Sequence, residues 1–315
     1  MSVQAGAPLP IDARASGLMV VLCLIWGLQQ VAVKAVADDI APILQIGLRS
    51  CVAVVLVILL IRWRRERIDW AGGSWRPGIL VGVLFGVEYL LVGEGLRFTT
   101  ASHMSVFLYT APIFAALGLQ WRLPAERLSP IQWGGILVAF LGIVIAFHDR
   151  GSSGREFSTD MLIGDLLGLL AGGVWGATTV VLRCSRLAYT PTTHTLLYQL
   201  LGAAVILVGM AVVSGQTRIH PTPLVYASMF YQTLLMAFGS LLVWFWLLRT
   251  YLASRLGVLS FMTPLFGVGF GVWLLDEPLD PGFVIGAALV MAGILLVSGH
   301  EWLRGRLRGR ARAKS

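Results

Sequence analysis

The sequence Glu-Arg-Leu-Ser-Pro at residues 126–130 returns as Glu-Pro-Leu-Asp-Pro at residues 277–281, which is 151 positions later. The glycines that follow keep the same spacing, since Gly135 and Gly142 return as Gly286 and Gly293. Five identities thus hold one register over seventeen positions. This agreement predicts that the chain contains two copies of one structural unit.

The duplication extends further toward the start of each copy. The dipeptide Trp-Gly at residues 26–27 returns at residues 175–176, and Ala-Ser at residues 101–102 returns at residues 253–254. Pro112 returns as Pro264. The offsets of 149 and 152 residues differ by only three, which is typical of aligned helices joined by loops of slightly different length.

Composition places the chain in a lipid bilayer. Of its 315 residues, 57% are hydrophobic and only 13% are charged, which is too apolar for a soluble protein of this length. A membrane-spanning helix needs about 20 predominantly apolar residues. Ten windows meet that requirement: 16–37, 43–62, 78–97, 100–121, 131–148, 161–182, 194–213, 223–249, 254–275 and 282–300.

Each copy contains five of these windows, so the second copy begins on the opposite side of the membrane and is inverted relative to the first. The predicted fold class is an all-α integral membrane protein with ten transmembrane helices, built from two inverted five-helix repeats. The expected divisions are an N-terminal segment (1–15), a first repeat (16–148), a connecting loop (149–160), a second repeat (161–300) and a basic tail (301–315).

The net charge of +8 is explained by orientation in the membrane. With both termini cytoplasmic, eighteen cations fall in cytoplasmic segments and four in outer loops, as the positive-inside rule favours. The expected location is the cell membrane, or the inner membrane where there are two. A basic tail can attract anionic lipid headgroups, and we expect no nucleic-acid partner.

Several of these residues resemble the drug/metabolite transporter superfamily, and specifically its ten-helix proteins with two EamA-type domains. The resemblance covers about residues 16–300. It lies in the two Trp-Gly pairs, Pro42 and Arg49 at the second helix, the prolines within the fourth and ninth helices, and the Glu-x-Leu turns. It implies a carrier of amino acids, other metabolites or toxic compounds, without specifying which.

Polar groups within the expected spans are candidates for function, because a charge near the bilayer centre costs roughly 2.5–3.5 kcal/mol. Glu88 lies near the middle of the third span, beside Tyr89, and Glu94 lies six residues later. We expect Glu88 to border a central cavity and to couple transport to protons. The alternative for either carboxylate is a buried ion pair with Lys34, Arg49 or His103.

The first and sixth spans carry matching polar and aromatic stripes. In the first, Trp26, Gln29 and Gln30 share a face with Lys34, because residues three and four apart are neighbours on a helix. The sixth carries Trp175, Thr178 and Thr179. Inverted symmetry would bring the stripes together as the lining of a substrate pathway, whereas the alternative is that they anchor the helices at interfaces.

Other candidates come from the fourth and the seventh to ninth spans. Pro112 and Pro264 occupy matching positions, where prolines indicate a hinge or a midplane site, or else a static kink. The remaining pathway candidates are His103, Thr110, Tyr198, Gln199, Tyr231 and Gln232. By contrast, the glycines of the fifth and tenth spans predict close helix packing and a purely structural role.

The predicted function is secondary active transport of a small organic solute by alternating access. An amino acid or related metabolite is expected, moved outward and driven by protons or by exchange. The sequence has no GxxxxGK[ST] phosphate loop, no cofactor motif and no metal-ligand spacing. The alternative is an integral-membrane enzyme acting on a lipid or isoprenoid. The expected partners are the solute and the bilayer, and oligomeric state is left open.

Overall fold

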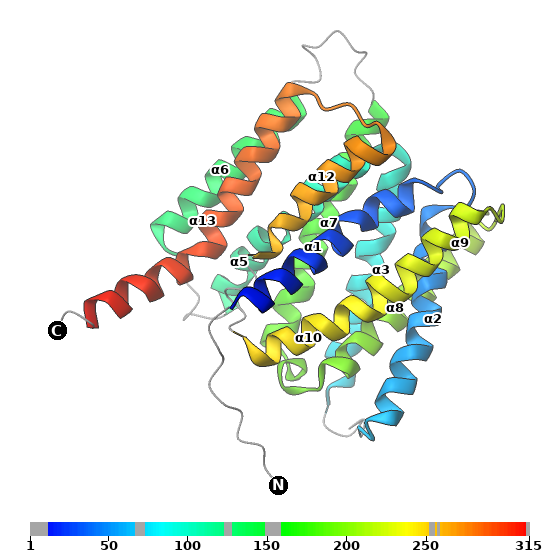
Figure 1. The fold of residues 1–315 in the computed structure, drawn as a ribbon, viewed down its shortest axis with the longest axis horizontal. Coiled ribbons are helices and arrows are strands. Elements are labelled where there is room, and N and C mark those ends of the chain that lie inside the picture. The colour runs from blue at the N-terminus through cyan, green and yellow to red at the C-terminus, as the bar shows by residue number, and fades with distance from the viewer. Residues whose placement is uncertain are drawn as a thin grey trace.

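The computed structural model describes residues 12–66, 73–122, 128–148, 159–251, 256 and 259–312. Helices make up nearly all of this part of the chain (Figure 1), and an isolated β-bridge joins Ile40 to Ile219. The helices of the first half are α1 (Ala13–Lys34), α2 (Pro42–Trp63), α3 (Trp75–Phe98), α4 (Ala101–Leu108), α5 (Ala111–Arg122) and α6 (Pro130–His148). Those of the second half are α7 (Thr159–Cys184), the short 3-10 helix η3 (Arg186–Tyr189), α8 (Thr192–Val213), α9 (Pro223–Phe230), η4 (Tyr231–Gly239), α10 (Ser240–Thr250), α12 (Met262–Leu275) and α13 (Pro281–Arg312).

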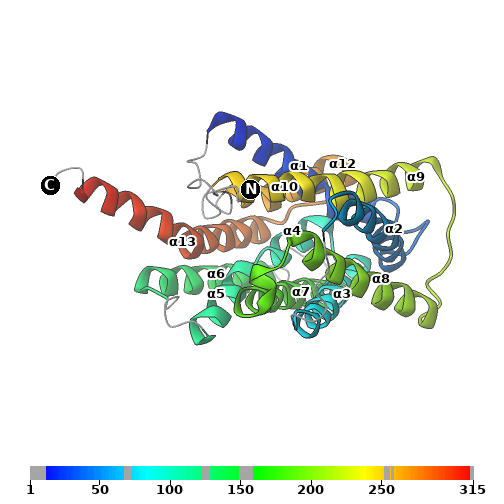
Figure 2. The same ribbon diagram turned by 90° about the horizontal axis from the view of Figure 1, so that it is seen from below.

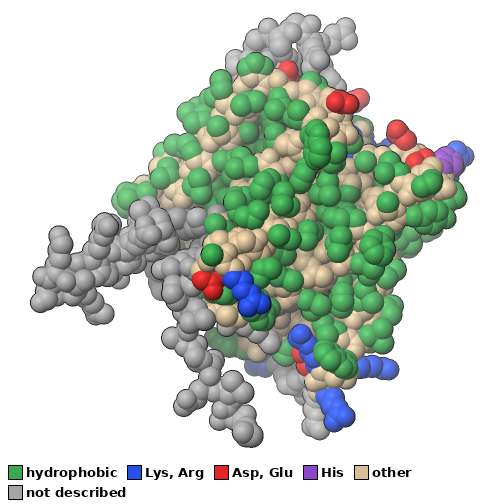
Figure 3. All heavy atoms as spheres, viewed as in Figure 1, with side chains coloured by type: hydrophobic (Ala, Val, Ile, Leu, Met, Phe, Trp, Pro, Cys, Tyr) green, Lys and Arg blue, Asp and Glu red, His purple; other side chains and the backbone are tan. Residues whose placement is uncertain are grey.

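Seven helical segments in the described residues are long and apolar enough to cross a membrane. Three shorter apolar helices, at Pro130–Ala146, Met262–Leu275 and Pro281–Leu296, fall in three further expected windows. Hydrophobic side chains cover most of the face in Figure 3, and charged side chains lie mainly toward its edges. The predicted class, an all-α integral membrane protein, is confirmed.

The helix starts follow local sequence rules. The Asp12 carboxylate accepts a hydrogen bond from the Ala15 N–H at 2.7 Å and so caps α1. That bond holds the pKa of Asp12, which precedes the membrane span, below its ordinary value. Thr100 caps α4 in the same way, and Pro42 opens α2, where its missing N–H has no cost.

Some of the described spans are not continuous α-helices, and one of these is the ninth, which has a turn at Phe261 directly before α12. The fourth breaks at Tyr109 and Thr110, where α4 ends at Leu108 and α5 begins at Ala111, one residue before Pro112. The break at this proline follows the sequence prediction. The eighth span contains a nine-residue π-helix, η4, which the hydrophobic pattern did not predict.

The two halves interleave rather than forming separate lobes. Helix α1 of the first half packs on α12 of the second, and α7 of the second half packs on α5 of the first. Helices α6 and α13 lie side by side at one end of the molecule (Figures 1 and 2). Their glycines interlock in opposite order, with Gly142 against Gly286 and Gly135 against Gly293, so the two helices run antiparallel.

The repeated Trp-Gly pair makes equivalent contacts in the two halves. A side chain at Gly27 would meet the Thr263 carbonyl and the Gly267 nitrogen of α12, each at 2.9 Å. A side chain at Gly176 would meet the Ala111 carbonyl at 3.0 Å and the Ala115 nitrogen at 2.9 Å, both on α5. Each glycine therefore allows close approach to the proline-containing helix of the opposite repeat.

Helices α3 and α8 make another close contact, since a Cβ at Gly202 would overlap the backbone of Gly82. We expect Gly202→Ala to lower the free energy of unfolding by about 1–3 kcal/mol, because the two backbones must separate. Thermal unfolding in detergent micelles measures this change.

Gly209→Ala is the matched control, because Gly209 lies on the same helix with no atom within 4 Å of a built Cβ. It should leave stability unchanged or raise it by about 0.5–1 kcal/mol, as alanine favours helix over glycine. Equal shifts in the two variants would contradict the close-packing explanation.

Candidate functional site

A cavity of about 260 Å³ lies among helices from both halves of the chain. Helices α1, α3, α4, α7, η4 and α10 all contribute to its wall. Its lining consists of Trp26, Gln29, Gln30, Phe85, Glu88, Tyr89, Leu108, Tyr109, Trp175, Met236, Leu241, Trp244 and Ser260. The volume is just below the roughly 300–1,000 Å³ of typical small-molecule sites, which indicates a small solute.

Six residues that the sequence singled out meet at this cavity. Helix α1 contributes Trp26, Gln29 and Gln30, whose three- and four-residue spacing puts them on one face. Helix α3 adds Glu88 and Tyr89, and α7 adds Trp175. Their role in substrate binding is a prediction, but their proximity is a property of the structure.

Aromatic rings form much of the wall and hold one another in edge contacts. The ring centroids of Trp26 and Trp244 lie 5.5 Å apart, and those of Tyr109 and Trp175 lie 5.3 Å apart, both at nearly perpendicular angles. The Trp26 indole also donates to the Ser240 hydroxyl at 3.0 Å. These contacts fix the aromatic surfaces before any solute arrives.

Of the described residues in this lining, Glu88 is the only acidic one, and its side chain is buried, with 4% of the residue exposed. Its Oε2 has no hydrogen-bond partner, and neither has Oε1 of Gln30 on the same cavity. A buried polar atom without a partner costs roughly 1–3 kcal/mol, and more when it is charged. Two residues that line the cavity, one on α1 and one on α3, thus each carry a buried acceptor without a partner among the described residues.

The alternative of a buried ion pair for Glu88 is wrong within the described residues. The Lys34 ammonium donates to the carbonyls of Leu96 and Thr99 at 2.5 and 2.8 Å. Those carbonyls lie at the end of α3, where a cation is favoured by the helix dipole. Arg49 and His103 bond to other partners, and no ion pair joins Glu88 to a described cation.

Glu94 lies outside the cavity lining, at the end of α3. Its carboxylate pairs with Arg97 at 2.5 Å and accepts from the Gln216 amide at 2.8 Å. The predicted ion pair with Lys34, Arg49 or His103 is therefore wrong for Glu94 as well. The reason is local, because Arg97 is three residues away on the same helix.

Arg49 belongs to a buried network that joins α2 to η4. Its guanidinium donates to Gln232 Oε1 at 3.3 Å, and its Cζ lies 5.0 Å from the Tyr89 ring centroid. The Gln232 amide donates in turn to Gln45 and to Ser228, each at 2.9 Å. The network lies behind Tyr89 and does not line the cavity.

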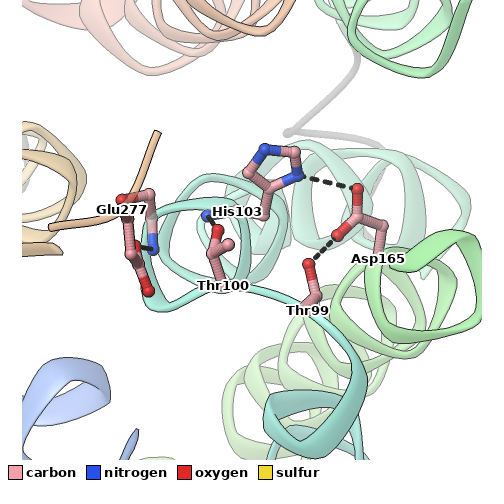
Figure 4. A network of polar contacts seen from close by, with 6 residues as sticks. Thr99, Thr100, His103, Asp165 and Glu277 are labelled. Atoms are coloured by element: carbon pink, nitrogen blue, oxygen red, sulfur yellow. Dashed lines mark hydrogen bonds and ion pairs between the residues drawn. The ribbon is translucent and has the colours of Figure 1, made fainter. Parts of the chain in front are cut away.

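A second buried network joins several helices around the start of α4. The Asp165 carboxylate lies 2.9 Å from His103 Nδ1 and accepts a hydrogen bond from the Thr99 hydroxyl (Figure 4). The His103 ring stacks on Phe283 with centroids 3.8 Å apart. These contacts tie together α3, α4, α7 and α13, so His103 lies in a helix-joining network and not in the cavity lining.

Glu277 caps a helix of the opposite repeat in the same region (Figure 4). Its carboxylate accepts from the N–H groups of Ala101 and Ser102 at 2.7 and 2.9 Å, and from the Ser102 hydroxyl at 2.5 Å. A carboxylate at a helix N-terminus satisfies amides that have no partner within the helix. The repeated glutamate of the Glu-x-Leu turn thus has a structural role here, whereas its counterpart Glu126 falls outside the described residues.

The other predicted pathway residues lie away from the cavity lining. The hydroxyls of Thr110, Thr178 and Thr179 bond to carbonyls of residues three or four positions earlier. The Tyr198 ring packs where a side chain at Gly78 would otherwise lie, and the Tyr231 hydroxyl donates to the Ile25 carbonyl. Gln199, on α8, is partly buried.

Sequence reasoning missed several residues that the structure brings into these sites. Phe85 lies three and four residues before Glu88 and Tyr89, so the helical period could have identified it. Asp165 is an acidic residue within the sixth window, and the argument applied to Glu88 would also have found it. Tyr109 at the broken fourth span and Ser260 had no such signal, because their positions depend on where helices are interrupted.

Comparison with known proteins assigns most of the chain to the family that the sequence motifs resemble. The model of the EamA-like transporter family matches residues 14–148 and again residues 162–299. A solved crystal structure with 21% identity superposes with a TM-score of 0.62, over 94% of this chain and 99% of that one, which supports the fold.

Several relatives are named as transporters or efflux pumps. "Uncharacterized transporter YoaV" of Bacillus subtilis is 26% identical over 87% of this chain and 92% of its own length. "Probable amino-acid metabolite efflux pump" of Escherichia coli is 22% identical over 92% of this chain and 97% of its own length. These findings favour transport over the alternative of a lipid-modifying enzyme. The chain is a multi-pass membrane protein of the EamA-like transporter family.

Proposed function

We propose that this transporter is a secondary carrier that binds a small organic solute, an amino acid or related metabolite, in the central cavity. The observation that carries the proposal is the pairing of Trp26 and Trp175 on that cavity. They are equivalent residues of the two repeats, and the glycine after each packs on the opposite repeat. A cavity shared between inverted repeats is the usual location of a carrier's substrate site.

This arrangement supports alternating access as the mechanism. If the repeats rock about the cavity, its wall can open first to one side of the membrane and then to the other. Tyr109 supports this mechanism, because it lines the cavity and also lies at the break between α4 and α5, three residues before Pro112. We propose that Pro112 and its counterpart Pro264 serve as hinges.

The polar networks at the other end of α4 would hold one side closed. Glu277 joins the second repeat to the N-terminus of α4, and Asp165 joins α7 to His103 and Thr99. In the opposite state these contacts would have to separate. Because a buried polar group without a partner is costly, partly separated forms of these contacts would be unfavourable, which supports two discrete arrangements.

Glu88 is the proposed proton-coupling group. A buried carboxylate with an unpartnered oxygen must take up a proton or a cationic partner, since an unpaired charge is costly in a dry site. The other titratable side chains of the lining are Tyr89 and Tyr109, and Arg49 lies behind Tyr89. Outward transport is supported by the name of the Escherichia coli relative.

We propose that both termini are cytoplasmic, in the cell or inner membrane. A fluorescent protein fused after Ser315 should then fluoresce, and alkaline phosphatase at the same place should be inactive. A phosphatase fusion in the turn after Gly215, which is expected outside, is the control and should be active. Reversed activities would overturn this topology.

Counterflow in proteoliposomes tests the carrier function. Vesicles loaded with an unlabelled amino acid or related metabolite should take up the labelled compound, while protein-free vesicles should not. Exchange needs no energy source, so this signal reports solute movement whatever the coupling. The absence of exchange across a broad panel of amino acids and metabolites would contradict the proposal.

Glu88→Gln tests coupling. At saturating solute, counterflow should persist in this variant, because the cavity remains. Accumulation driven by an imposed pH gradient should fall to the level measured without a gradient, because the amide cannot exchange a proton.

Glu94→Gln is the matched control on the same helix, since Glu94 lies outside the cavity and is paired with Arg97. It should keep the response to the gradient. Unchanged pH dependence in Glu88→Gln would remove Glu88 from the coupling role.

A further inference from the structure

We infer that the solute is an organic cation with a flat apolar part, and that its charged group lies against Glu88. This inference rests on the proposed function, because it concerns the same cavity. It narrows the solute from amino acids and related metabolites to those with a net positive charge, such as amines and amino-acid amides.

The Glu88 carboxylate lacks both a hydrogen-bond donor and an opposite charge among the described residues. Among the described residues it is the one acidic group of the lining, and its Oε2 is buried with no partner there. An ammonium or guanidinium group would supply both the hydrogen-bond donor and the opposite charge that this oxygen lacks. Hydrogen bonds to charged groups are stronger than neutral ones. A neutral or anionic solute would fail to supply the opposite charge, even where it supplied a hydrogen-bond donor.

The side-chain amide of Gln30 adds a second acceptor to the same lining. Gln30 Oε1 is also buried without a partner and belongs to the same lining. A primary ammonium carries three donors, so it can satisfy two acceptors at once. The unsatisfied atoms of this cavity are thus both acceptors, which is the complement of a solute rich in N–H donors.

The described lining contains no lysine, arginine or histidine. The carboxylate of an amino acid would have no cation to pair with there. Lys34 bonds to the carbonyls at the end of α3, and His103 lies against Asp165. Arg49 is bonded to Gln232 on the far side of the lining. A net cation therefore fits better than a zwitterion, and a zwitterion better than an anion.

The aromatic side chains of the wall also suit a cation with a flat apolar part. Trp26, Trp175 and Trp244 line the cavity together with Tyr89 and Tyr109. Indole and phenol faces attract cations and also accept flat apolar groups. The volume of about 260 Å³ limits the solute to a small molecule. A cation attached to a single aromatic ring combines these requirements.

The test is a series of solutes that share a phenyl ring and differ in charge: phenethylamine and phenylalaninamide (cations), phenylalanine (zwitterion) and 3-phenylpropionate (anion). Calorimetric titration of the purified full-length protein at pH 7 measures their dissociation constants. We expect the cations to bind about ten-fold or more tightly than phenylalanine, and 3-phenylpropionate to bind weakest. Binding of phenylalanine or 3-phenylpropionate as tightly as the amines would overturn the inference.

Variants then assign the preference to one residue. Glu88→Gln should remove the preference for the cations, whereas the matched Glu94→Gln should keep it. Glu88→Asp, which retains the charge, should keep the order of affinities even where Glu88→Gln does not fold. A preference that survives in folded Glu88→Gln would also overturn the inference.

Counterflow of the same four compounds separates this inference from the proposed function. Exchange of phenylalanine or 3-phenylpropionate in preference to the amines would leave the carrier function standing and overturn the cation preference. Exchange of the amines in preference to the other two would support both. Neither binding nor exchange of any of the four would overturn the cation preference, while the broader metabolite panel would still decide the carrier function.

Discussion

The structure depends on two equivalent close contacts, Gly27 on α12 and Gly176 on α5. In each, a helix of one repeat lies against the proline-containing helix of the other, with backbone separations that leave no space for a side chain. Because the contacts cross between repeats, the halves interleave and cannot form separate lobes. The tryptophan before each glycine then reaches the same central cavity from two sides.

The cavity is symmetric in its framework and asymmetric in its chemistry. Trp26 and Trp175 come from matching positions, but the single carboxylate comes from α3 alone. The corresponding span of the second half, residues 223–250, has no acidic residue and contains the π-helix η4 instead. Two equivalent tryptophans thus contribute to the wall, while the carboxylate to which we assign the solute preference lies outside the repeat pattern.

Buried polar groups divide into those that join helices and those that lack partners. Asp165, Glu277 and Arg49 each bind groups on other helices, so they stabilise the arrangement of the bundle. Glu88 and Gln30 each have an unpartnered oxygen, and both line the cavity. Burial alone does not separate the two classes, because Asp165 and Glu88 are both nearly inaccessible. The two classes are separated by whether the buried atoms have hydrogen-bond partners among the described residues.

The sequence by itself determined the spans, the duplication and the faces of single helices. Hydrophobic length and spacing are local properties, so Trp26, Gln29 and Gln30 could be assigned to one stripe and Glu88 identified as an exceptional charge. Only the tertiary structure decided which stripes meet and which charges are paired. The sequence predicts His103 and Gln232 as pathway residues, whereas the structure places them outside the described cavity lining and bonds them to Asp165 and Gln45. Such partners come from distant parts of the chain, and contacts of that kind depend on how helices cross rather than on the pattern along any one of them.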